Sequence, residues 1–319
     1  MNIEGSRVLI TGGAGFIGSF LAEALSDTCD VLVVDNLSSG KKEFVDALIK
    51  EHGVRFAKVD ILKGSISQFF KDRDTVIHLA SNPDVRSGIK QPSIHFEANV
   101  VMTHRLLESM RSSDIKTVLY SSTSTVYGEP MVSPTPEDYG PLIPISVYGA
   151  TKLASEALIS SYAKMQGWRA LIFRFANVVG GRGTHGVTFD FVNKLKKNPK
   201  KMQILGKPPG TLKSYVHISD VVTGMMSAWR FEGEQVDFYN VGSEDMMLVG
   251  DIARIVAEEM GLDDVKFEWE GGVDDGRGWA GDVKRMILSI ERLRRTGWRP
   301  RFKSAEAVRL AAKELLGKA

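Results

Sequence analysis

The sequence predicts an α/β fold built on a doubly wound parallel sheet. Short apolar runs rich in β-branched residues alternate with longer stretches that repeat apolar residues at helical spacing. Near-continuous apolarity suits strands covered on both faces, and regular strand–helix alternation is typical of a parallel sheet between helices. The predicted strands are Arg7–Thr11, Asp30–Asp35, Thr75–Leu79, Thr117–Ser121 and Arg169–Phe173. The helices predicted between them are Phe16–Ser26, Lys41–Glu51, Ser93–Ser112 and Val147–Met165.

Length and composition limit the class of protein. The chain has 319 residues, of which 43% are hydrophobic and 25% charged, as in ordinary globular proteins. Its 41 Lys and Arg against 39 Asp and Glu give a net charge of +2, which argues against nucleic acid as a main partner. Cys29 is the one cysteine, so no intrachain disulfide forms. No apolar run reaches the ~20 residues of a membrane span, and the start lacks a signal-peptide layout. We expect a soluble cytoplasmic protein.

Beyond Asn177 the pattern becomes less regular. Glycine and proline clusters interrupt it at 180–186, 207–210 and 271–278, which predicts a smaller, loop-rich α+β lobe. The basic run Lys194–Lys197 is interpreted as a solvated helix face, with phosphate binding as the alternative. The helices predicted in this lobe are Val187–Asn198, Val221–Arg230, Leu248–Met260 and Ser304–Leu316.

Three glycines carry the first functional signal. Gly12, Gly15 and Gly18 follow the first predicted strand and open the first predicted helix. That spacing allows a tight turn, close approach of a dinucleotide pyrophosphate to the helix N-terminus, and close helix–strand packing. Asp35 ends the second strand, where a carboxylate binds a ribose 2′-hydroxyl and repels a 2′-phosphate, so NAD is favoured over NADP. The alternative is a structural turn with a capping aspartate.

Two nearby pairs bear on the same cofactor. Lys41 and Lys42 follow Asp35 closely and could oppose its preference, but they are more simply the exposed start of a helix. Asp60 and Ile61 follow the third strand, where they would lie near an adenine ring. For that pair, a plain strand-end turn is an equal alternative.

Tyr148 and Lys152 form a second signal. Four residues apart on a helix, they share one face, so an ammonium lies near a phenol. A phenol has an ordinary pKa of ~10 and burial raises it, so a base acting near neutral pH needs neighbouring cations. Lys152 and the cationic ring of NAD⁺ could supply them together. In isolation such a spacing is more often an exposed helical pair; after a dinucleotide motif, a catalytic base is favoured.

A run of hydroxyl residues follows the predicted strand Thr117–Ser121. It spans Ser121–Gly128 at the carboxyl edge of the sheet, where ligands of open α/β folds bind. One of these hydroxyls could bond the substrate oxygen that loses a proton. The alternative is a turn whose hydroxyls cap backbone groups.

In this order, these motifs resemble the extended short-chain dehydrogenase/reductase family over essentially the whole chain. Within it, the chain is most similar to UDP-glucose (UDP-galactose) 4-epimerases of archaeal type. The residues that carry the resemblance are the glycine loop, Asp35–Gly40, His78–Ala80, Thr125–Gly128, Tyr148–Lys152, Arg174–Asn177 and Gly281–Asp282.

The resemblance implies a division of labour along the chain. Residues 1–178, with a return of 214–240, would form an NAD-binding Rossmann-type domain, and 179–319 a nucleotide-sugar-binding lobe. A homodimer would pack Ser93–Ser112 and Val147–Met165 against a second copy. The implied NAD-binding residues are Gly12, Gly15, Phe16, Ile17, Gly18, Asp35, Asn36, Ser38, Ser39, Gly40, Asp60, Ile61, Leu79, Ala80, Ser81, Asn99, Tyr148 and Lys152.

The resemblance also implies a chemistry. Thr123 would be the catalytic hydroxyl, Tyr148 the base and Lys152 its electrostatic partner, in a 4-epimerisation of a UDP-hexose through a transient 4-keto sugar. Lys213 stands where relatives often carry a phosphate-binding arginine; Arg277 is a second candidate, although Trp279 stands nearer the expected place. The implied substrate-binding residues are Arg86, Thr123, Tyr148, Asn177, Lys213 and Arg277.

The residues after Thr123 distinguish among related activities. In the related sugar 4,6-dehydratases this place reads Thr-Asp-Glu, and in sugar-nucleotide decarboxylases it reads Thr-Ser-Glu. In this chain Thr123 is followed by Ser124 and Thr125. Without a carboxylate at either place, elimination lacks its acid–base pair, which favours epimerisation. The alternatives are an epimerase of UDP-N-acetylhexosamines, a net nucleotide-sugar oxidoreductase or dehydratase, and a non-catalytic dinucleotide sensor. Met286, at the position tied to sugar size, is compatible with either hexose class.

Overall fold

The computed structural model describes residues 3–273 and 276–319. The chain forms two compact units, and three segments contribute to each. The first unit comprises Met1–Val126, Val147–Arg174 and Met225–Tyr239, and the second Tyr127–Ser146, Phe175–Gly224 and Asn240–Ala319.

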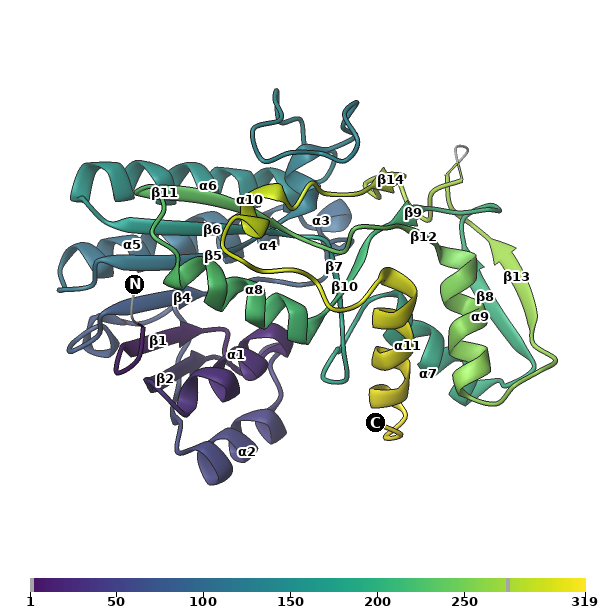
Figure 1. Ribbon diagram of the computed structural model, residues 1–319, viewed down its shortest axis with the longest axis horizontal. Helices are drawn as coiled ribbons and strands as arrows, with labels where there is room; N and C mark the ends of the chain where they lie inside the picture. The colour runs from purple at the N-terminus through teal and green to yellow at the C-terminus, as the bar shows by residue number, and fades with distance from the viewer. Residues whose placement is uncertain (1–2, 274–275) are drawn as a thin grey trace. The chain divides into compact units, whose positions relative to one another are not determined.

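A seven-stranded sheet forms the centre of the first unit (Figure 1). Its strands are β1 (Arg7–Thr11), β2 (Asp30–Asp35), β3 (Arg55–Lys58), β4 (Thr75–His78), β5 (Thr117–Thr123), β6 (Arg169–Phe175) and β11 (Val236–Val241). They lie in the order β11-β6-β5-β4-β1-β2-β3, and β1 to β5 pair in parallel. The order reverses between β1 and β4, the point beside which ligands of such sheets bind. The predicted fold class is confirmed.

Helices on both faces of this sheet complete the Rossmann-type layering (Figure 1). α1 and α2 pack against each other, as do α5 and α6. β5 continues two residues beyond the predicted strand end, so Ser122 and Thr123 belong to the strand and not to a turn. The helices are α1 (Phe16–Ser26), α2 (Lys42–His52), α3 (Ser87–Lys90), α4 (Ser93–His95), α5 (Met102–Arg111), α6 (Val147–Gln166) and α8 (Ile218–Arg230), the last shared between the units.

The predicted helix Ser93–Ser112 is helical from Ser93 to Arg111 but not uniform. A π-helical turn, Phe96–Val101, separates α4 from α5. A π turn holds an additional residue and changes which side chains face inward before and after it. His95 and Asn99, at this turn, are 0% and 1% exposed.

The core of the first unit explains why its strands read as continuous apolar runs. Val76, Val118 and Ile172 come from β4, β5 and β6, and Leu106 and Leu107 from α5; all are fully buried in one cluster. Burying such a side chain contributes about 1.5–3 kcal/mol each. Local periodicity and long-range packing therefore agree in this unit.

His78, at the end of β4, is a buried polar exception. Its Nδ1 lies 2.7 Å from Thr11 Oγ1 and its Nε2 lies 3.1 Å from Thr103 Oγ1. Burial lowers the pKa of His78 to about 3, with a smaller contribution from the Lys152 charge. The ring is therefore neutral at physiological pH.

This burial predicts an acid-sensitive fold. Below pH ~6.5 the unfolded chain protonates this histidine while the folded chain does not, so stability falls by about 1.4 kcal/mol per pH unit down to the folded pKa. Urea unfolding between pH 7 and pH 5 measures the slope. His78→Asn, which does not titrate, is expected to show a shallower slope than the parent protein. Equal slopes of stability against pH in His78→Asn and the parent protein would mean that His78 does not cause the acid sensitivity.

The second unit contains more sheet than the sequence predicts. Its strands are β7 (Asn177–Val179), β8 (Lys201–Leu205), β9 (Leu212–Lys213), β10 (Tyr215–His217), β12 (Met247–Leu248), β13 (Lys266–Glu270) and β14 (Arg285–Met286). β7 pairs with β10, β8 with β13, and β9 lies between β12 and β14. The sequence predicts no strand in this unit. Five of these seven strands have only two or three residues and so show no period-2 pattern, whereas β8 and β13, of five residues each, were missed.

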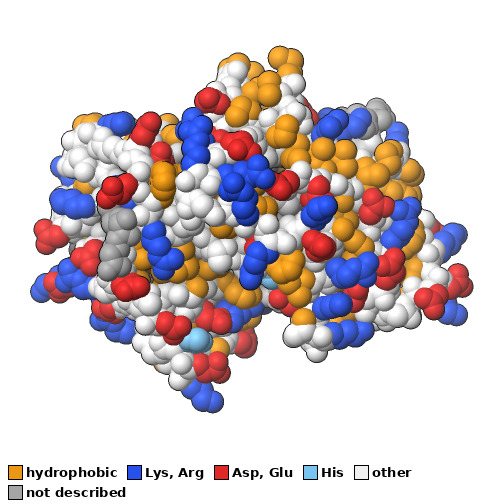
Figure 2. Space-filling model, viewed as in Figure 1, with side chains coloured by type: hydrophobic (Ala, Val, Ile, Leu, Met, Phe, Trp, Pro, Cys, Tyr) orange, Lys and Arg blue, Asp and Glu red, His pale blue; other side chains and the backbone are white. Residues whose placement is uncertain are grey.

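The helices of this unit are α7 (Val187–Lys197), α9 (Val249–Glu259), α10 (Glu291–Arg294) and α11 (Ser304–Leu315), and α7, α9 and α11 pack with these strands. The long ones lie within two residues of their predicted bounds, and their core includes Phe191, Val256 and Val308. No helix among residues 3–273 and 276–319 is long and apolar enough to cross a membrane. Positive and negative side chains are intermixed over the face in Figure 2.

Candidate active site

The glycine loop of the first unit leaves the N-terminus of α1 open to an anion. α1 follows Gly15, no side chain caps its N-terminus, and its first turn carries no acidic residue. Gly12 adopts φ +74°, and a Cβ placed there would approach Ala80 N to 2.6 Å. Only glycine fits this left-handed, crowded position without strain. The loop therefore presents bare backbone at a helix N-terminus, as pyrophosphate binding requires.

Asp35 holds the glycine loop to the end of β2. Its carboxylate accepts hydrogen bonds from Ala14 N at 3.1 Å and Leu37 N at 2.7 Å. Burial raises the pKa of Asp35, and the two backbone bonds oppose the rise. A Cβ on Gly40 would lie 3.0 Å from Asp35 Oδ1, so that glycine keeps the carboxylate approachable. The neighbouring loop residues Asn36, Ser38 and Ser39, and the lysines Lys41 and Lys42, are exposed.

Asp60 and Ile61 form a strand-end turn after β3. Asp60 Oδ1 accepts from Leu62 N at 3.0 Å, and its carboxylate lies 3.3 Å from Lys63 Nζ. Ile61 is 4% exposed and packs in the core. The turn interpretation is therefore confirmed, and a contact with adenine remains a prediction.

Tyr148 and Lys152 lie close together on α6, as their spacing predicts. Lys152 Nζ is 5.9 Å from the Tyr148 ring centroid and 4.8 Å from that of Tyr120. The ammonium donates to Ser121 O on β5 at 2.9 Å, and Lys152 is 2% exposed. A buried cation beside a phenol is thus fixed to the end of a central strand.

Burial dominates both titrations in the protein alone. It raises the pKa of Tyr148 to about 12, against the lowering effect of a hydrogen bond with Ser81. It lowers the pKa of Lys152 to about 7, opposed by the negative charge of Glu156. In the protein alone the Lys152 cation does not outweigh burial at Tyr148, because the same burial weakens the cation itself. The expectation that Lys152 and the ring of NAD⁺ together favour the phenolate concerns the NAD-bound protein and stays a prediction.

A polar chain connects the π-helical turn to Tyr148. Asn99 Nδ2 donates to Thr151 Oγ1 at 2.9 Å, and Asn99 Oδ1 accepts from Ser81 Oγ at 2.8 Å. Ser81 in turn bonds the Tyr148 hydroxyl. Leu79 and Ala80, which precede Ser81, continue from β4; Leu79 N donates to Thr11 O at 3.0 Å.

Thr123 ends β5, two residues beyond the carbonyl that holds Lys152. Its Oγ1 accepts from Thr125 N at 3.2 Å and lies 3.1 Å from Thr125 Oγ1. Thr123 is 8% exposed. The structure therefore brings Thr123, Lys152 and Tyr148 to the same end of the sheet.

A buried ion pair lies one turn further along α6, and sequence reasoning missed it. Arg174 Nη2 lies 2.7 Å from Glu156 Oε2, and both side chains are under 5% exposed. Ser122 Oγ also donates to Glu156. The available signal was Glu156 at four residues after Lys152, which puts it on the same helix face.

The substrate candidates of the second unit gather around Asp282. Lys213 Nζ pairs with the Asp282 carboxylate, and Arg277 Nη1 donates to Asp282 O at 3.3 Å. Arg277 also lies 3.7 Å from Glu129. Asn177 Nδ2 instead donates to Ser214 O at 3.0 Å.

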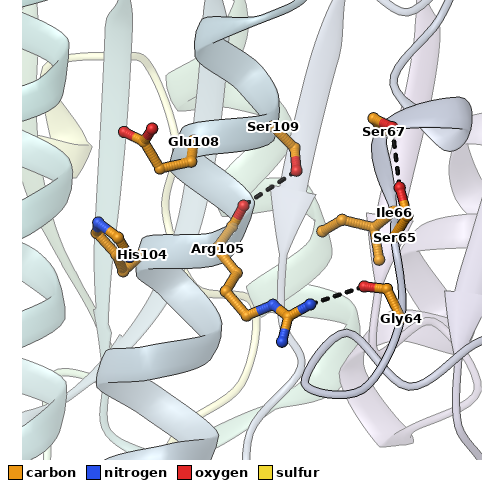
Figure 3. A pocket seen from close by; sticks show the side chains of 8 residues that line it. All are labelled: Gly64, Ser65, Ile66, Ser67, His104, Arg105, Glu108 and Ser109. Atoms are coloured by element: carbon orange, nitrogen blue, oxygen red, sulfur yellow. Dashed lines mark hydrogen bonds between the residues drawn. The ribbon is translucent and has the colours of Figure 1, made fainter.

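Other candidates lie apart from these clusters. Arg86 is exposed before α3, and Met286 is 3% exposed on β14, in register with Lys213. A surface pocket of the first unit lies between loop 64–67 and α5, where Arg105 donates to Gly64 O at 2.7 Å (Figure 3). None of the predicted site residues lines it. Within the described part of the chain, no group of three or more His, Cys, Asp or Glu is placed to hold a metal.

Comparison with known proteins places these features in a family. Residues 8–242 match the model of the NAD dependent epimerase/dehydratase family. A UDP-galactose 4-epimerase of solved structure is 41% identical, with TM-score 0.87 over 98% of this chain and 99% of that one. The Thermus thermophilus UDP-glucose 4-epimerase, solved with NAD, is 30% identical, with TM-score 0.84 over 98% and 100%. A Methanocaldococcus jannaschii protein provisionally named UDP-glucose 4-epimerase is 33% identical over 95% of this chain and 96% of its own.

The chain belongs to the NAD-dependent epimerase/dehydratase family, within the extended short-chain dehydrogenases/reductases. More narrowly, it is an NAD-dependent enzyme of the UDP-sugar 4-epimerase group. The residues fit this cofactor. Gly12 leaves a cradle that a Cβ would fill, the N-terminus of α1 is uncapped, and Asp35 offers a carboxylate at the end of β2.

Asp35 gives a direct test of cofactor choice. Loss of one charged hydrogen bond to ribose is expected to weaken NAD binding about 10- to 100-fold in Asp35→Asn. NADP should lose less, because the repulsion of its 2′-phosphate disappears with the charge. Calorimetric titration of cofactor-stripped protein measures both, with Asp46→Asn on exposed α2 as the matched control. An unchanged NAD/NADP ratio would remove Asp35 from the ribose site.

Proposed function

We propose that the protein interconverts UDP-glucose and UDP-galactose by 4-epimerisation, with Tyr148 as the base. The names of the relatives above support the sugar nucleotide, and the residues of the first unit support the chemistry. In this proposal the first unit binds NAD and the second recognises the nucleotide sugar.

One observation carries the choice of epimerisation. Thr125, where elimination would need a carboxylate, carries a hydroxyl that is engaged with Thr123 at 3.1 Å. The buried carboxylate of Glu156 is held by Arg174 and Ser122. Proton removal at one oxygen is therefore supported, whereas expulsion of water has no acid–base pair.

In this proposal each residue of the first unit has a separate part in the reaction. Tyr148, as phenolate, takes the proton of the sugar 4′-hydroxyl, while Thr123 hydrogen-bonds the same oxygen. Bound NAD⁺ supplies the hydride acceptor, the returning hydride and the positive ring charge that favours the phenolate. Lys152, fixed on Ser121 O, adds its cation when protonated. The 4-keto sugar would have to rotate within the site so that its other face is reduced. We therefore expect few tight hydrogen bonds to the hexose.

In this proposal the protein holds its substrate mainly by the diphosphate group. Lys213 and Arg277 supply cations, Asn177 an amide and Arg86 a further guanidinium. Lys213 is already paired with Asp282, so binding must exchange that carboxylate for phosphate. Met286 is buried, and the tolerance for N-acetylated sugars depends on how it repacks.

The experiment is an assay of the protein as purified, without added NAD. UDP-galactose and UDP-glucose should each reach the same equilibrium mixture, with no net formation of reduced cofactor. Stoichiometric reduced cofactor and a keto product would instead indicate a net oxidoreductase. Parallel assays with the two UDP-N-acetylhexosamines separate the alternative substrate class. If no UDP-sugar is converted, the result would favour the alternative of a non-catalytic dinucleotide sensor.

We also propose a homodimer that packs Ser93–Ser112 and Val147–Met165 against a second copy. Met165 at the end of α6 is 76% exposed and Phe96 in the π-helical turn is 52% exposed, which suits a covered surface. Sedimentation of the intact protein tests this, and a monomer at micromolar concentration would exclude it.

A further inference from the structure

His95 packs directly against the ring of the proposed base. Its ring centroid lies 5.4 Å from that of Tyr148, with an angle of 73° between the planes. This is the edge-to-face geometry that aromatic rings favour. His95 is 0% exposed, so its ring shifts only when its neighbours shift.

The opposite side of His95 is held by the segment Asp84–Gly88. His95 Nε2 lies 3.4 Å from Ser87 Oγ, and the Ser87 hydroxyl donates its own proton to Asp84 O at 2.6 Å. The imidazole Nε2 is therefore the donor of the weaker bond. A Cβ placed on Gly88 would come within 2.6 Å of His95 Cδ2. Backbone of α3 thus touches one edge of the imidazole while Tyr148 contacts its ring.

The titration of this histidine also depends on the segment Asp84–Gly88. Burial lowers the pKa of His95, whereas backbone hydrogen bonds with Val85 and Asp84 and the Asp84 charge raise it; the Lys152 charge adds to the lowering. Among the described residues, His95 Nδ1 has no hydrogen-bond partner. The ring is therefore linked to the segment Asp84–Gly88 on one side and packs against Tyr148 on the other.

We propose that His95 is a positioning residue that transmits the placement of segment Asp84–Gly88 to the phenol of Tyr148. This rests on the proposed function, in which Tyr148 is the base. Arg86 lies in the same segment and is exposed. A shift of this segment when Arg86 binds the substrate diphosphate would therefore reach the phenol ring through His95.

The Gly88 contact gives the sharpest test. Gly88→Ala adds a methyl group against His95 Cδ2, and the displaced ring is expected to lower kcat about 10- to 100-fold, with KM little changed. In a His95→Ala background the methyl group has room. The double variant should therefore match His95→Ala instead of adding a second loss. The single variant His95→Phe keeps an aromatic ring at this position, so its kcat should lie within about threefold of the kcat of the parent protein.

A second readout separates positioning from general damage to the fold. In NAD⁺-loaded protein, the near-ultraviolet absorbance of tyrosinate should appear at higher pH in Gly88→Ala and His95→Ala, because Tyr148 leaves its place beside Lys152. His95→Phe should titrate as the parent does. Lys90→Ala, an exposed change on the same short helix, is the matched control. If His95→Ala does not fold, Ser87→Ala replaces it, with an expected loss of about threefold and a shift in the same direction.

The outcomes distinguish this inference from the function beneath it. Parent-like kcat and titration in His95→Ala, or equal harm from Gly88→Ala with and without the ring, overturn the positioning role. If Tyr148→Phe is inactive in the same assays, the proposed function survives that result. If Tyr148→Phe also retains turnover, the proposed function fails first.

Discussion

Tyr148→Phe is expected to lower turnover about 10²- to 10⁴-fold in both directions while the protein keeps its cofactor. The substitution removes one hydroxyl and leaves the ring against His95, 5.4 Å between centroids. Lys152 keeps its bond to Ser121 O. Initial rates with UDP-galactose and UDP-glucose, together with the cofactor content of the purified protein, measure the effect.

The controls use hydroxyls on the same elements. Tyr162→Phe, also on α6, removes a 2.6 Å bond to Glu108 and should leave turnover within about twofold, as expected away from the chemistry. Thr123→Val should cost less than Tyr148→Phe, because the hydroxyl assists the base without replacing it. Near-parent turnover in Tyr148→Phe would remove the phenol from the mechanism.

Glu156→Gln is expected to lower the free energy of unfolding by about 3–5 kcal/mol, since it leaves the Arg174 charge buried without its counter-ion. Arg174 and Glu156 are both under 5% exposed as side chains. The same change removes the negative charge that raises the pKa of Lys152. Stability and the titration of Lys152 should therefore move together, with the Lys152 pKa lower in the variant.

Urea unfolding of Glu156→Gln and Asp46→Asn measures this difference. Asp46 pairs with Lys42 on exposed α2, and its loss should cost only about 0.3–0.5 kcal/mol. A Glu156→Gln midpoint equal to that of Asp46→Asn would mean that the buried pair contributes no more than a surface one.

Prediction from sequence worked where the signal was local. Arg7–Thr11, Phe16–Ser26 and Asp30–Asp35 have the predicted bounds, because glycines or an aspartate mark the ends of strong apolar patterns. The proximity of Tyr148 and Lys152 followed from helix geometry alone. These features need no knowledge of distant partners.

The remainder depended on partners far apart in the chain. β9 and β14 are two residues long, and Lys213 meets Met286 across them, a pairing without a local pattern. The titration of Tyr148 likewise depends on burial of the phenol in the folded protein, which its spacing to Lys152 does not reveal. Glu156 looked like an ordinary charged helix residue until β6 supplied Arg174.

The π-helical turn Phe96–Val101 has a consequence for how this chain can change over evolution. Each helical residue turns the chain by about 100°, so deletion of one residue there would rotate His95 and Asn99 relative to Leu106 and the rest of α5. Either the residues around the base or those in the hydrophobic core would then face the wrong way. Insertions and deletions are therefore expected to be rarer across this turn in a sample of descendants than in the exposed loop at residues 63–65.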